Sequence, residues 1–311
     1  MGRTATKRVL VGLDLAPSGE EISDGASLAV ERTVLLASAI GARVTVFHST
    51  HGGEYFDQAE GGRLWRTEQG LSASARGALD EVVERLSSAG VEADLVLDRR
   101  PAWVGIVDHV ERHDIDLVVV GKRSHGDFDF DARKLGTVAL RLMRRCPCAV
   151  WTVRPGGGAR VERIVAATDL SRDVGRRVIE QGAWLASVLG AELHLLHACA
   201  LSWSEALVAD GAERTVRLAA AQRHARAKMA RQLEDSGWGV EAQFHLPGRR
   251  PARAVYDTAV QLDAGLVMMG TVSRSGLAGV LVGNTAERML GMLDRSLWTL
   301  KPRGFVAPPM R

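Results

Sequence analysis

The sequence predicts an α/β protein with two doubly wound, five-stranded parallel sheets in tandem. Three observations support this fold class. Short segments rich in Val, Leu and Ile alternate with longer amphipathic segments, a pattern typical of strands and helices in βαβ units. The whole pattern occurs twice along the chain. The length of 311 residues leaves room for two domains of about 150 residues each.

The duplication is visible in residue pairs that keep a nearly constant separation. Three pairs lie 147 to 149 positions apart: His48 and His197, Gly121 and Gly270, and Trp151 and Trp298. A spacing held over so many elements indicates duplication of a whole domain. We therefore expect domains at residues 1–155 and 156–311, with a flexible Gly- and Pro-containing linker at 154–161.

Each half is expected to present the same order of elements. Strands are expected at residues 8–13, 43–47, 92–97, 117–120 and 149–153, and again at 163–167, 192–196, 241–245, 266–269 and 297–300. Helices are expected at 26–40, 71–89 and 103–112, and again at 174–189, 213–235, 252–262 and from 284. Helix 26–40 is expected to turn its apolar side chains toward the core, namely Leu28, Val30, Val34, Leu35, Ala37 and Ile40.

Composition narrows the function classes. The net charge is only +3, from 40 basic and 37 acidic residues, which gives no electrostatic case for nucleic-acid binding. No apolar run reaches the ~20 residues of a membrane span. Three cysteines in a chain of this size argue against a disulfide framework and predict a cytoplasmic protein.

An acidic residue follows the first strand of each half, at Asp14 and Asp169. Ligands of doubly wound sheets bind outside the carboxyl ends of the strands, where the strand order switches. A carboxylate there can accept a hydrogen bond from a ribose hydroxyl. It can equally cap the next helix or turn, and the sequence leaves both roles open.

A glycine-rich loop follows the fourth strand of each half and leads into a helix, an arrangement that holds phosphates through backbone amides. The candidate residues of the second half are Met269, Gly270, Ser273, Gly283, Asn284 and Thr285. Those of the first half are Gly121, Gly136 and Thr137.

Together these residues resemble the universal stress protein family, whose pattern is G-x2-G-x9-G-[ST] after a strand, with Asp at the end of the first strand. The run GNTAER at 283–288 and the duplication resemble its tandem-domain members. The resemblance covers residues 7–154 and 161–302. It implies Rossmann-like domains, a stress-response binding or signalling function, and a site for ATP or another adenine nucleotide with its Mg²⁺. The family also includes branches that bind no nucleotide.

Both loops depart from the family pattern. In the second half, Ser273 replaces the second glycine and Asn284 replaces Ser/Thr. In the first half, Ser124 replaces the same glycine, the spacing is longer, and the insertion adds three acids: Asp127, Asp129 and Asp131. Carboxylates repel a triphosphate at close range, so the nucleotide is expected mainly in the second half.

In family members with a single domain, the last strands form a dimer. The segments AVWTV and SLWTL around Trp151 and Trp298 are therefore expected to pair within this chain. A further homodimer of the whole chain stays open.

Other motifs favour ordinary structural roles over metal or redox sites. His109 and His113 have a zinc-compatible spacing but lack a third ligand, and DHVERHD is expected to form an exposed face. The acidic run DFDFD lacks the Gly and Glu of a calcium loop. Cys146-Pro147-Cys148 is not the CxxC of a redox site. The basic run 217–231 is expected to be a solvated helix face.

The sequence contains no GxSxG elbow and no Walker lysine. This favours binding over catalysis. The alternatives are a slow ATPase and a scaffold whose degenerate sites hold an apolar ligand.

Overall fold

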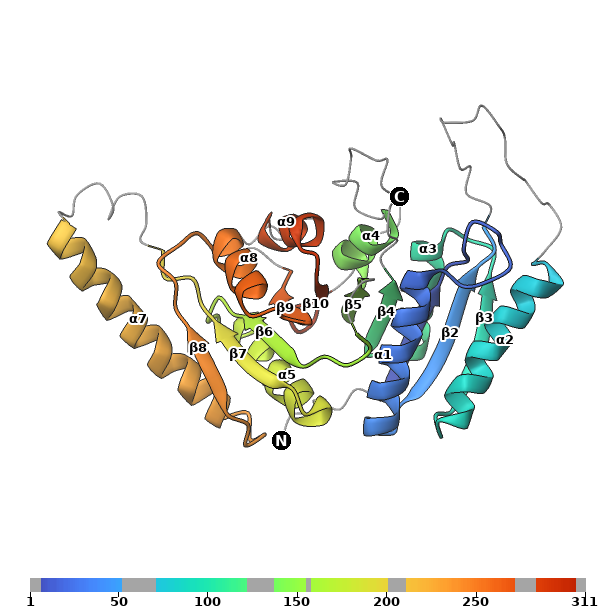
Figure 1. Ribbon diagram of the computed structural model, residues 1–311, viewed down its shortest axis with the longest axis horizontal. Coiled ribbons are helices and arrows are strands. Elements are labelled where there is room, and N and C mark those ends of the chain that lie inside the picture. Colours follow the sequence, from blue (N-terminus) through green and yellow to red (C-terminus); the bar gives the residue numbers. More distant parts are fainter. Residues whose placement is uncertain are drawn as a thin grey trace, which may run out of the picture.

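The computed structural model describes residues 7–51, 71–121, 137–154, 158–200, 211–271 and 284–305. In this part of the chain the strands form one ten-stranded sheet, in the order β3-β2-β1-β4-β5-β10-β9-β6-β7-β8 (Figure 1). Within each half all neighbouring strands are parallel. This confirms the predicted α/β class.

The strands are β1 (Arg8–Leu13), β2 (Arg43–Ser49), β3 (Ala93–Asp98), β4 (Leu117–Gly121), β5 (Ala149–Val153), β6 (Arg163–Ala167), β7 (Glu192–Leu196), β8 (Ala242–His245), β9 (Leu266–Gly270) and β10 (Ser296–Leu300). The helices are α1 (Asp24–Ile40), α2 (Ala73–Ser88), α3 (Ala102–His113), α4 (Thr137–Arg145), α5 (Val174–Leu189), α7 (Gly211–Glu234), α8 (Pro251–Gln261) and α9 (Asn284–Met292).

Helix ends follow from local sequence. The Ser23 side chain caps α1 by accepting a hydrogen bond from the Ala26 amide at 3.1 Å. Helices α1 and α5 both end at a glycine in the left-handed region, Gly41 at φ 62° and Gly190 at φ 64°. Glycine adopts this conformation without the strain that a Cβ would bring. Helices α1 and α5 therefore end in the same way in the two halves.

Helices cover both faces of the sheet (Figure 1). Helices α1, α2, α5 and α7 lie on one face, and α3, α4, α8 and α9 lie on the other. On the first face, one hydrophobic cluster runs through both halves and includes Trp151 and Trp298. On the second face there are two clusters, and the one in the second half also takes in Ala139 and Met143 of α4. The two halves therefore share part of their core.

Strands β5 and β10 pair antiparallel and join the halves, as the sequence predicts. Trp151 lies opposite Trp298, with ring centroids 5.3 Å apart. Side-chain hydroxyls reinforce the junction, since Thr152 donates to the Leu297 carbonyl at 3.1 Å and Thr299 donates to the Val150 carbonyl at 3.2 Å.

Across this junction, a basic residue of each half donates hydrogen bonds to the C-terminal end of a helix in the other half. Arg154 follows β5 and donates to the Leu293 carbonyl at the end of α9 at 3.0 Å, and it pairs with Asp294 at 2.5 Å. Lys301 follows β10 and donates to two carbonyls at the end of α4. Cations are favourable at helix C-termini. Burial nevertheless lowers the Lys301 pKa to about 8.

Helix α1 differs in part from its predicted apolar stripe. Leu35 belongs to that stripe but is 39% exposed, whereas Arg32 and Thr33 are buried. Arg32 is buried because α1 also contacts α5 of the other half, which covers a face that a single domain would leave in water.

Candidate functional site

The candidate sites lie where the strand order switches. In each half, the strand that precedes the acidic residue has neighbours on both sides, which are β2 and β4 around β1, and β7 and β9 around β6. Asp14 and Asp169 therefore lie at the carboxyl edge of the central strand of their half. This is the predicted position for a ligand of a doubly wound sheet.

The second half has a hollow of about 420 Å³ at this point. Asp169, Leu170 and Ser171 line it from the turn after β6, and His197 lines it from the end of β7. Helix α7 contributes His224 and Lys228. The hollow thus combines a carboxylate, a hydroxyl, two imidazoles and an ammonium group.

The turn after β6 is tightly hydrogen bonded. The Thr168 hydroxyl accepts from the Leu170 amide at 3.0 Å and donates to the Gly175 carbonyl at 2.9 Å. Asp169 Oδ1 accepts from the Ser171 amide at 2.9 Å, and Ser171 Oγ accepts from the Gly175 amide at 2.8 Å. Together these bonds tie the turn to the first turn of α5.

Leu170 lies in the left-handed region at φ 59°, which costs a residue with a Cβ about 1–2 kcal/mol. The hydrogen bonds around it hold this strained turn, and its neighbour Asp169 lines the hollow. Strain of this kind is typical of functional turns.

A histidine supports the same turn in both halves. His197 Nδ1 lies 2.9 Å from the Thr168 carbonyl, and His48 Nδ1 lies 3.0 Å from the Leu13 carbonyl. A carbonyl only accepts, so Nδ1 carries the proton in each ring. Burial lowers the His48 pKa, against opposing effects of its bond to Leu13 and of Asp14. The repeated histidine therefore orients the peptide group before the acid.

In the first half, Asp14 takes part in capping α1. Its Oδ1 accepts from the Ser23 hydroxyl at 2.6 Å, and its carbonyl accepts from the Ser23 amide at 3.0 Å. Ser23 in turn is the N-cap of α1. The sequence left two roles open for these acids, and the structure shows the capping role. One carboxylate oxygen of Asp14 and one of Asp169 accept hydrogen bonds within the turn that follows the strand or at the start of the next helix.

Two candidate phosphate glycines have a packing role. A Cβ on Gly121 would lie 2.3 Å from the carbonyl carbon of Gly25 in α1, and a Cβ on Gly270 would lie 2.2 Å from Val174 Cγ1 in α5. Either distance is far below a permitted contact. Each glycine ends the fourth strand of its half and lets the first helix pack closely against it.

The remaining candidates are only partly described. Ser273, Gly283 and Gly136 lie outside the described residues, as do Ser124 and the DFDFD run. Asn284 and Thr285 open α9, and Thr137 opens α4. The Met269 side chain is 5% exposed and belongs to the core beneath α8 and α9, so that side chain does not form part of the hollow.

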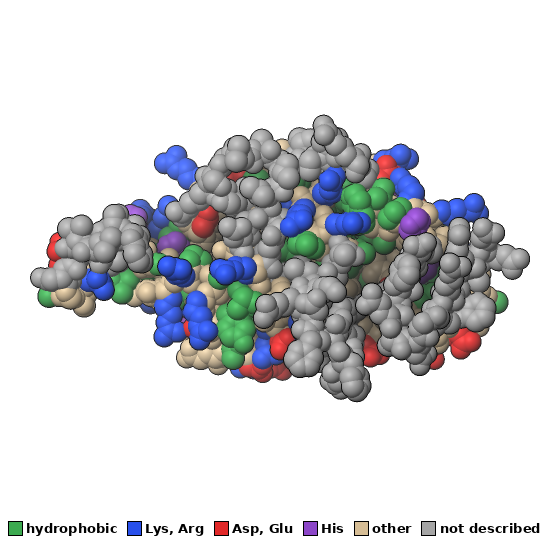
Figure 2. All heavy atoms as spheres, turned by 90° about the horizontal axis from the view of Figure 1, so that it is seen from above, with side chains coloured by type: hydrophobic (Ala, Val, Ile, Leu, Met, Phe, Trp, Pro, Cys, Tyr) green, Lys and Arg blue, Asp and Glu red, His purple; other side chains and the backbone are tan. Residues whose placement is uncertain are grey.

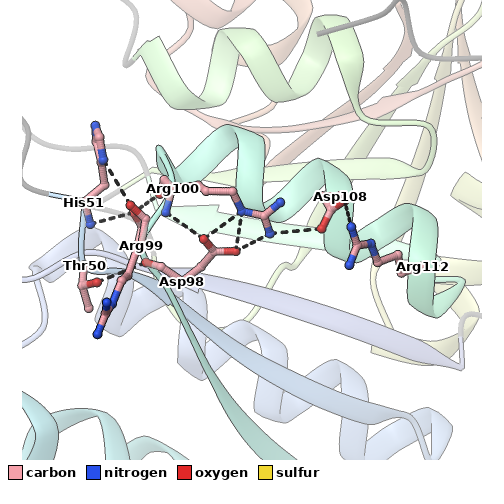
Figure 3. A network of polar contacts seen from close by, with 8 residues as sticks. Thr50, His51, Asp98, Arg99, Arg100, Asp108 and Arg112 are labelled. Carbon is pink, nitrogen blue, oxygen red and sulfur yellow. Dashed lines mark hydrogen bonds and ion pairs between the residues drawn. The ribbon is translucent and has the colours of Figure 1, made fainter.

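A cluster of ion pairs joins the end of β3 to α3 in the first half (Figure 3). Arg100 lies between two carboxylates, at 2.5 Å from Asp98 and 3.0 Å from Asp108, and Arg112 reaches Asp108 at 2.9 Å. The hydrogen bonds from Arg100 lower the Asp98 pKa. The second half has a matching cluster, in which Arg249 and Arg253 pair with Asp257 at 2.6 and 2.9 Å, so this feature does not distinguish the two halves.

The charge at the outer helix differs between the halves. When α2 and α7 are aligned on the glycines that follow them, Gly90 and Gly237, the positions of His224 and Lys228 are taken by Gly77 and Glu81. Figure 2 shows Lys and Arg side chains scattered over the visible face, at the α7 end and elsewhere. The second half therefore offers the better site for an anionic ligand.

Sequence reasoning missed His224 and Lys228 as site residues, because both fall in or beside the basic run expected to be a solvated face. It noted His197 only as a landmark of the duplication. A signal was available in the sequence, because a histidine recurs at the strand end beside Asp14 and again beside Asp169. This repetition indicates a shared role.

The histidine motif of α3 is less exposed than predicted. The His109 ring is partly buried and lies 6.3 Å from Phe47 and 4.1 Å from His113. The β2 strand beneath the helix brings Phe47 against this face.

Within the described ranges there is no group of three metal-ligating side chains, and no helix there has the length and apolarity to cross a membrane.

Comparisons with known proteins agree with the fold. The model of the universal stress protein family matches residues 5–154 and again 160–299. Universal stress protein E of Escherichia coli K12 is 26% identical over 90% of this chain and 91% of its own length. A Haemophilus influenzae homolog of universal stress protein E is 29% identical over 63% of this chain and 65% of its own.

A solved structure of a functionally unknown protein from Pseudomonas aeruginosa PAO1 has the same fold. It superposes with a TM-score of 0.69 at 21% identity, over 96% of this chain and 93% of that one. At this identity the likeness concerns the fold alone.

Proposed function

Because the chain belongs to the universal stress protein family, we propose that it is a binding and signalling module of the stress response that takes an adenine nucleotide in its second half. ATP with its Mg²⁺ is the proposed ligand. The observation that supports this is the hollow beside Asp169, which places a carboxylate at the strand switch and His224 and Lys228 on the α7 side.

Each group has a chemical role in this proposal. The Asp169 carboxylate accepts a hydrogen bond from a ribose hydroxyl, while Lys228 and His224 donate from α7. The phosphates extend from Gly270 toward the start of α9, where Asn284 and Thr285 stand. Backbone amides at a helix N-terminus favour negative charge there.

The first half is proposed as the weaker site. Gly77 stands at the position that corresponds to His224, and Glu81 stands at the position that corresponds to Lys228. A carboxylate there repels an anion that an ammonium group would attract. The pair Asp14 and Asp169 therefore offers a matched comparison within one chain.

The test is calorimetric titration of ATP into the full chain and into the Asp169→Asn and Asp14→Asn variants. Asparagine keeps an oxygen for the turn but removes the charge. Loss of a charged hydrogen bond of about 1.5–3 kcal/mol predicts binding weaker by about tenfold or more in Asp169→Asn. Asp14→Asn should bind as the wild type does.

Equal weakening in both variants would contradict the assignment to the second half. Absence of heat with intact protein would overturn the nucleotide part altogether. Mass spectrometry of the denatured, freshly purified protein adds an independent readout, since a co-purified lipid would favour the scaffold alternative. Phosphate release that depends on Asp169 would favour the slow ATPase.

We also propose a cytoplasmic location. All three cysteines are free thiols, and Cys146 and Cys148 form no disulfide although their sulfur atoms lie within hydrogen-bond distance at 3.4 Å. Unpaired thiols in such proximity fit a reducing compartment. Localisation of a tagged full-length chain by cell fractionation tests this proposal.

A further inference from the structure

A second cavity lies between the halves, on the face of the sheet covered by α1 and α5. Its volume is about 230 Å³. Seven of the nine lining residues have apolar side chains, and they include Leu35, Trp151, Val161 and Val188. Arg32 and Arg160 also line it, and they supply its charge. This cavity is separate from the hollow beside Asp169 and shares no lining residue with it.

Arg32 is a buried cation without an anionic partner among the described residues. It is 2% exposed. One guanidinium nitrogen donates to Ser296 Oγ at 2.5 Å and the other to the Gly158 carbonyl at 3.1 Å, while Nε has no hydrogen-bond partner. The nearby acid Glu31 forms an ion pair with Arg85 at 3.6 Å.

Such an arrangement is unfavourable by itself. Buried charges are normally paired with an opposite charge, because the lost hydration is not recovered by neutral partners alone. The Trp151 ring, 5.7 Å from the guanidinium carbon, offers a cation–π contact that compensates only partly. A cavity beside an uncompensated guanidinium is suited to an anion.

The cavity arises because the two halves carry side chains of different size at one equivalent helix position. When α1 and α5 are aligned on Gly41 and Gly190, Leu35 corresponds to Trp184. Trp184 is 3% exposed and packs edge-on against Trp298 at 6.3 Å. In the first half, Leu35 at the matching place is 39% exposed. The smaller side chain leaves the space beside Trp151 open.

Arg160 adds a second positive charge at the rim. Its side chain is exposed, and it makes no ion pair with any residue in the described part of the chain. A ligand anion could therefore meet one fixed guanidinium and one adaptable guanidinium. Guanidinium groups bind carboxylates through paired hydrogen bonds.

We propose that this inter-domain cavity binds a small organic anion, a carboxylate with a short aliphatic or aromatic body. The carboxylate pairs with Arg32 and Arg160, and the apolar body lies against Trp151 and Leu35. The volume lies below the ~300–1,000 Å³ of pockets for drug-sized ligands, which favours a compact molecule. The inference does not depend on the nucleotide proposal.

The experiment uses the full chain with octanoate and phenylacetate as probes and 1-octanol as the uncharged control. Binding is measured by calorimetry and by tryptophan emission, because Trp151 lines the cavity. We expect saturable binding of a carboxylate and at least about tenfold weaker binding of the alcohol, as loss of a charged hydrogen bond implies.

Two variants locate the site, and a third serves as the control. Leu35→Trp fills the space as Trp184 does in the other half and should abolish binding while both arginines remain. Arg160→Gln should weaken binding about tenfold or more. Arg223→Gln, on the exposed face of α7, is the matched control and should leave binding unchanged. Because Leu35 lies at the surface, its variant keeps the test informative even if an Arg32→Met variant does not fold.

Failure of both carboxylates to bind the wild type would overturn the proposal. Binding that survives Leu35→Trp would overturn it as well, because the ligand would then lie elsewhere. If ATP titration of the same proteins fails while octanoate binding persists, only the nucleotide proposal is lost.

Discussion

Substitution of the two strand-end glycines separates a packing role from a ligand role. In Gly121→Ala the new Cβ would lie 2.3 Å from one backbone carbon and 2.4 Å from one backbone oxygen of Gly25. The backbone cannot rotate out of the way, so α1 and β4 must move apart. In Gly270→Ala the obstacle is a single methyl group, Val174 Cγ1 at 2.2 Å.

The magnitudes follow from this difference. Overpacking a close-packed interior costs about 1–3 kcal/mol. We expect Gly121→Ala at or above the top of that range, since main-chain atoms must shift, and Gly270→Ala near the bottom. Combining Gly270→Ala with Val174→Ala removes the obstructing methyl group. The double variant should therefore lie within about 0.5 kcal/mol of Val174→Ala alone.

The assay is urea denaturation of the four variants, followed by ATP titration of those that fold. If Gly270 serves only packing, the double variant regains both stability and ATP affinity. If its backbone also approaches a phosphate, stability returns and affinity does not. Wild-type stability in Gly121→Ala would refute the packing argument, and so would a double variant as unstable as the sum of its parts.

Three further predictions concern the shared core and its titratable groups. Burial lowers the pKa of Lys301 to about 8, so between pH 8 and 10.5 the unfolded chain binds more protons than the folded one. The free energy of unfolding should therefore rise by up to about 3 kcal/mol over that pH range. The Lys301→Met variant should lack this rise. Burial, and then the charge of His194, lower the His245 pKa; stability should fall as the pH drops below about 6.5, and less so in His245→Gln. Trp298→Asp places a charge in a fully buried site at the strand junction and should cost at least about 4 kcal/mol in denaturant unfolding, whereas Val216→Asp on the exposed face of α7 should cost nothing measurable.

Features set by periodicity and repetition could be predicted from the sequence. The pairing of β5 with β10 followed from the matching Trp-containing segments, and the place of Asp14 and Asp169 followed from their position after the first strand of each half. These inferences needed only the alternation of strands and helices and the constant spacing of the repeat.

Features that depend on which elements meet in space could not be predicted. Lys228 reaches the hollow because α7 packs beside the turn after β6, and the sequence of α7 alone shows only a basic face. From the sequence alone, Gly121 and Gly270 fit a phosphate loop and a packing contact equally well. Only the distance to the neighbouring helix separates the two roles. Arg32 is buried only because the second half covers α1.

The fusion of two domains in one chain explains how the inter-domain cavity can exist. In a symmetric dimer each surface residue occurs on both partners, so a substitution at the interface changes both sides together. In this chain the position of Trp184 in α5 is taken by Leu35 in α1, and the position of Arg32 is taken by Gln181. One side of the junction is thus filled by tryptophan, while the other keeps an open, positively charged cavity. A symmetric homodimer cannot hold this asymmetry. Leu35→Trp restores the matching tryptophan and tests whether the open side serves a ligand.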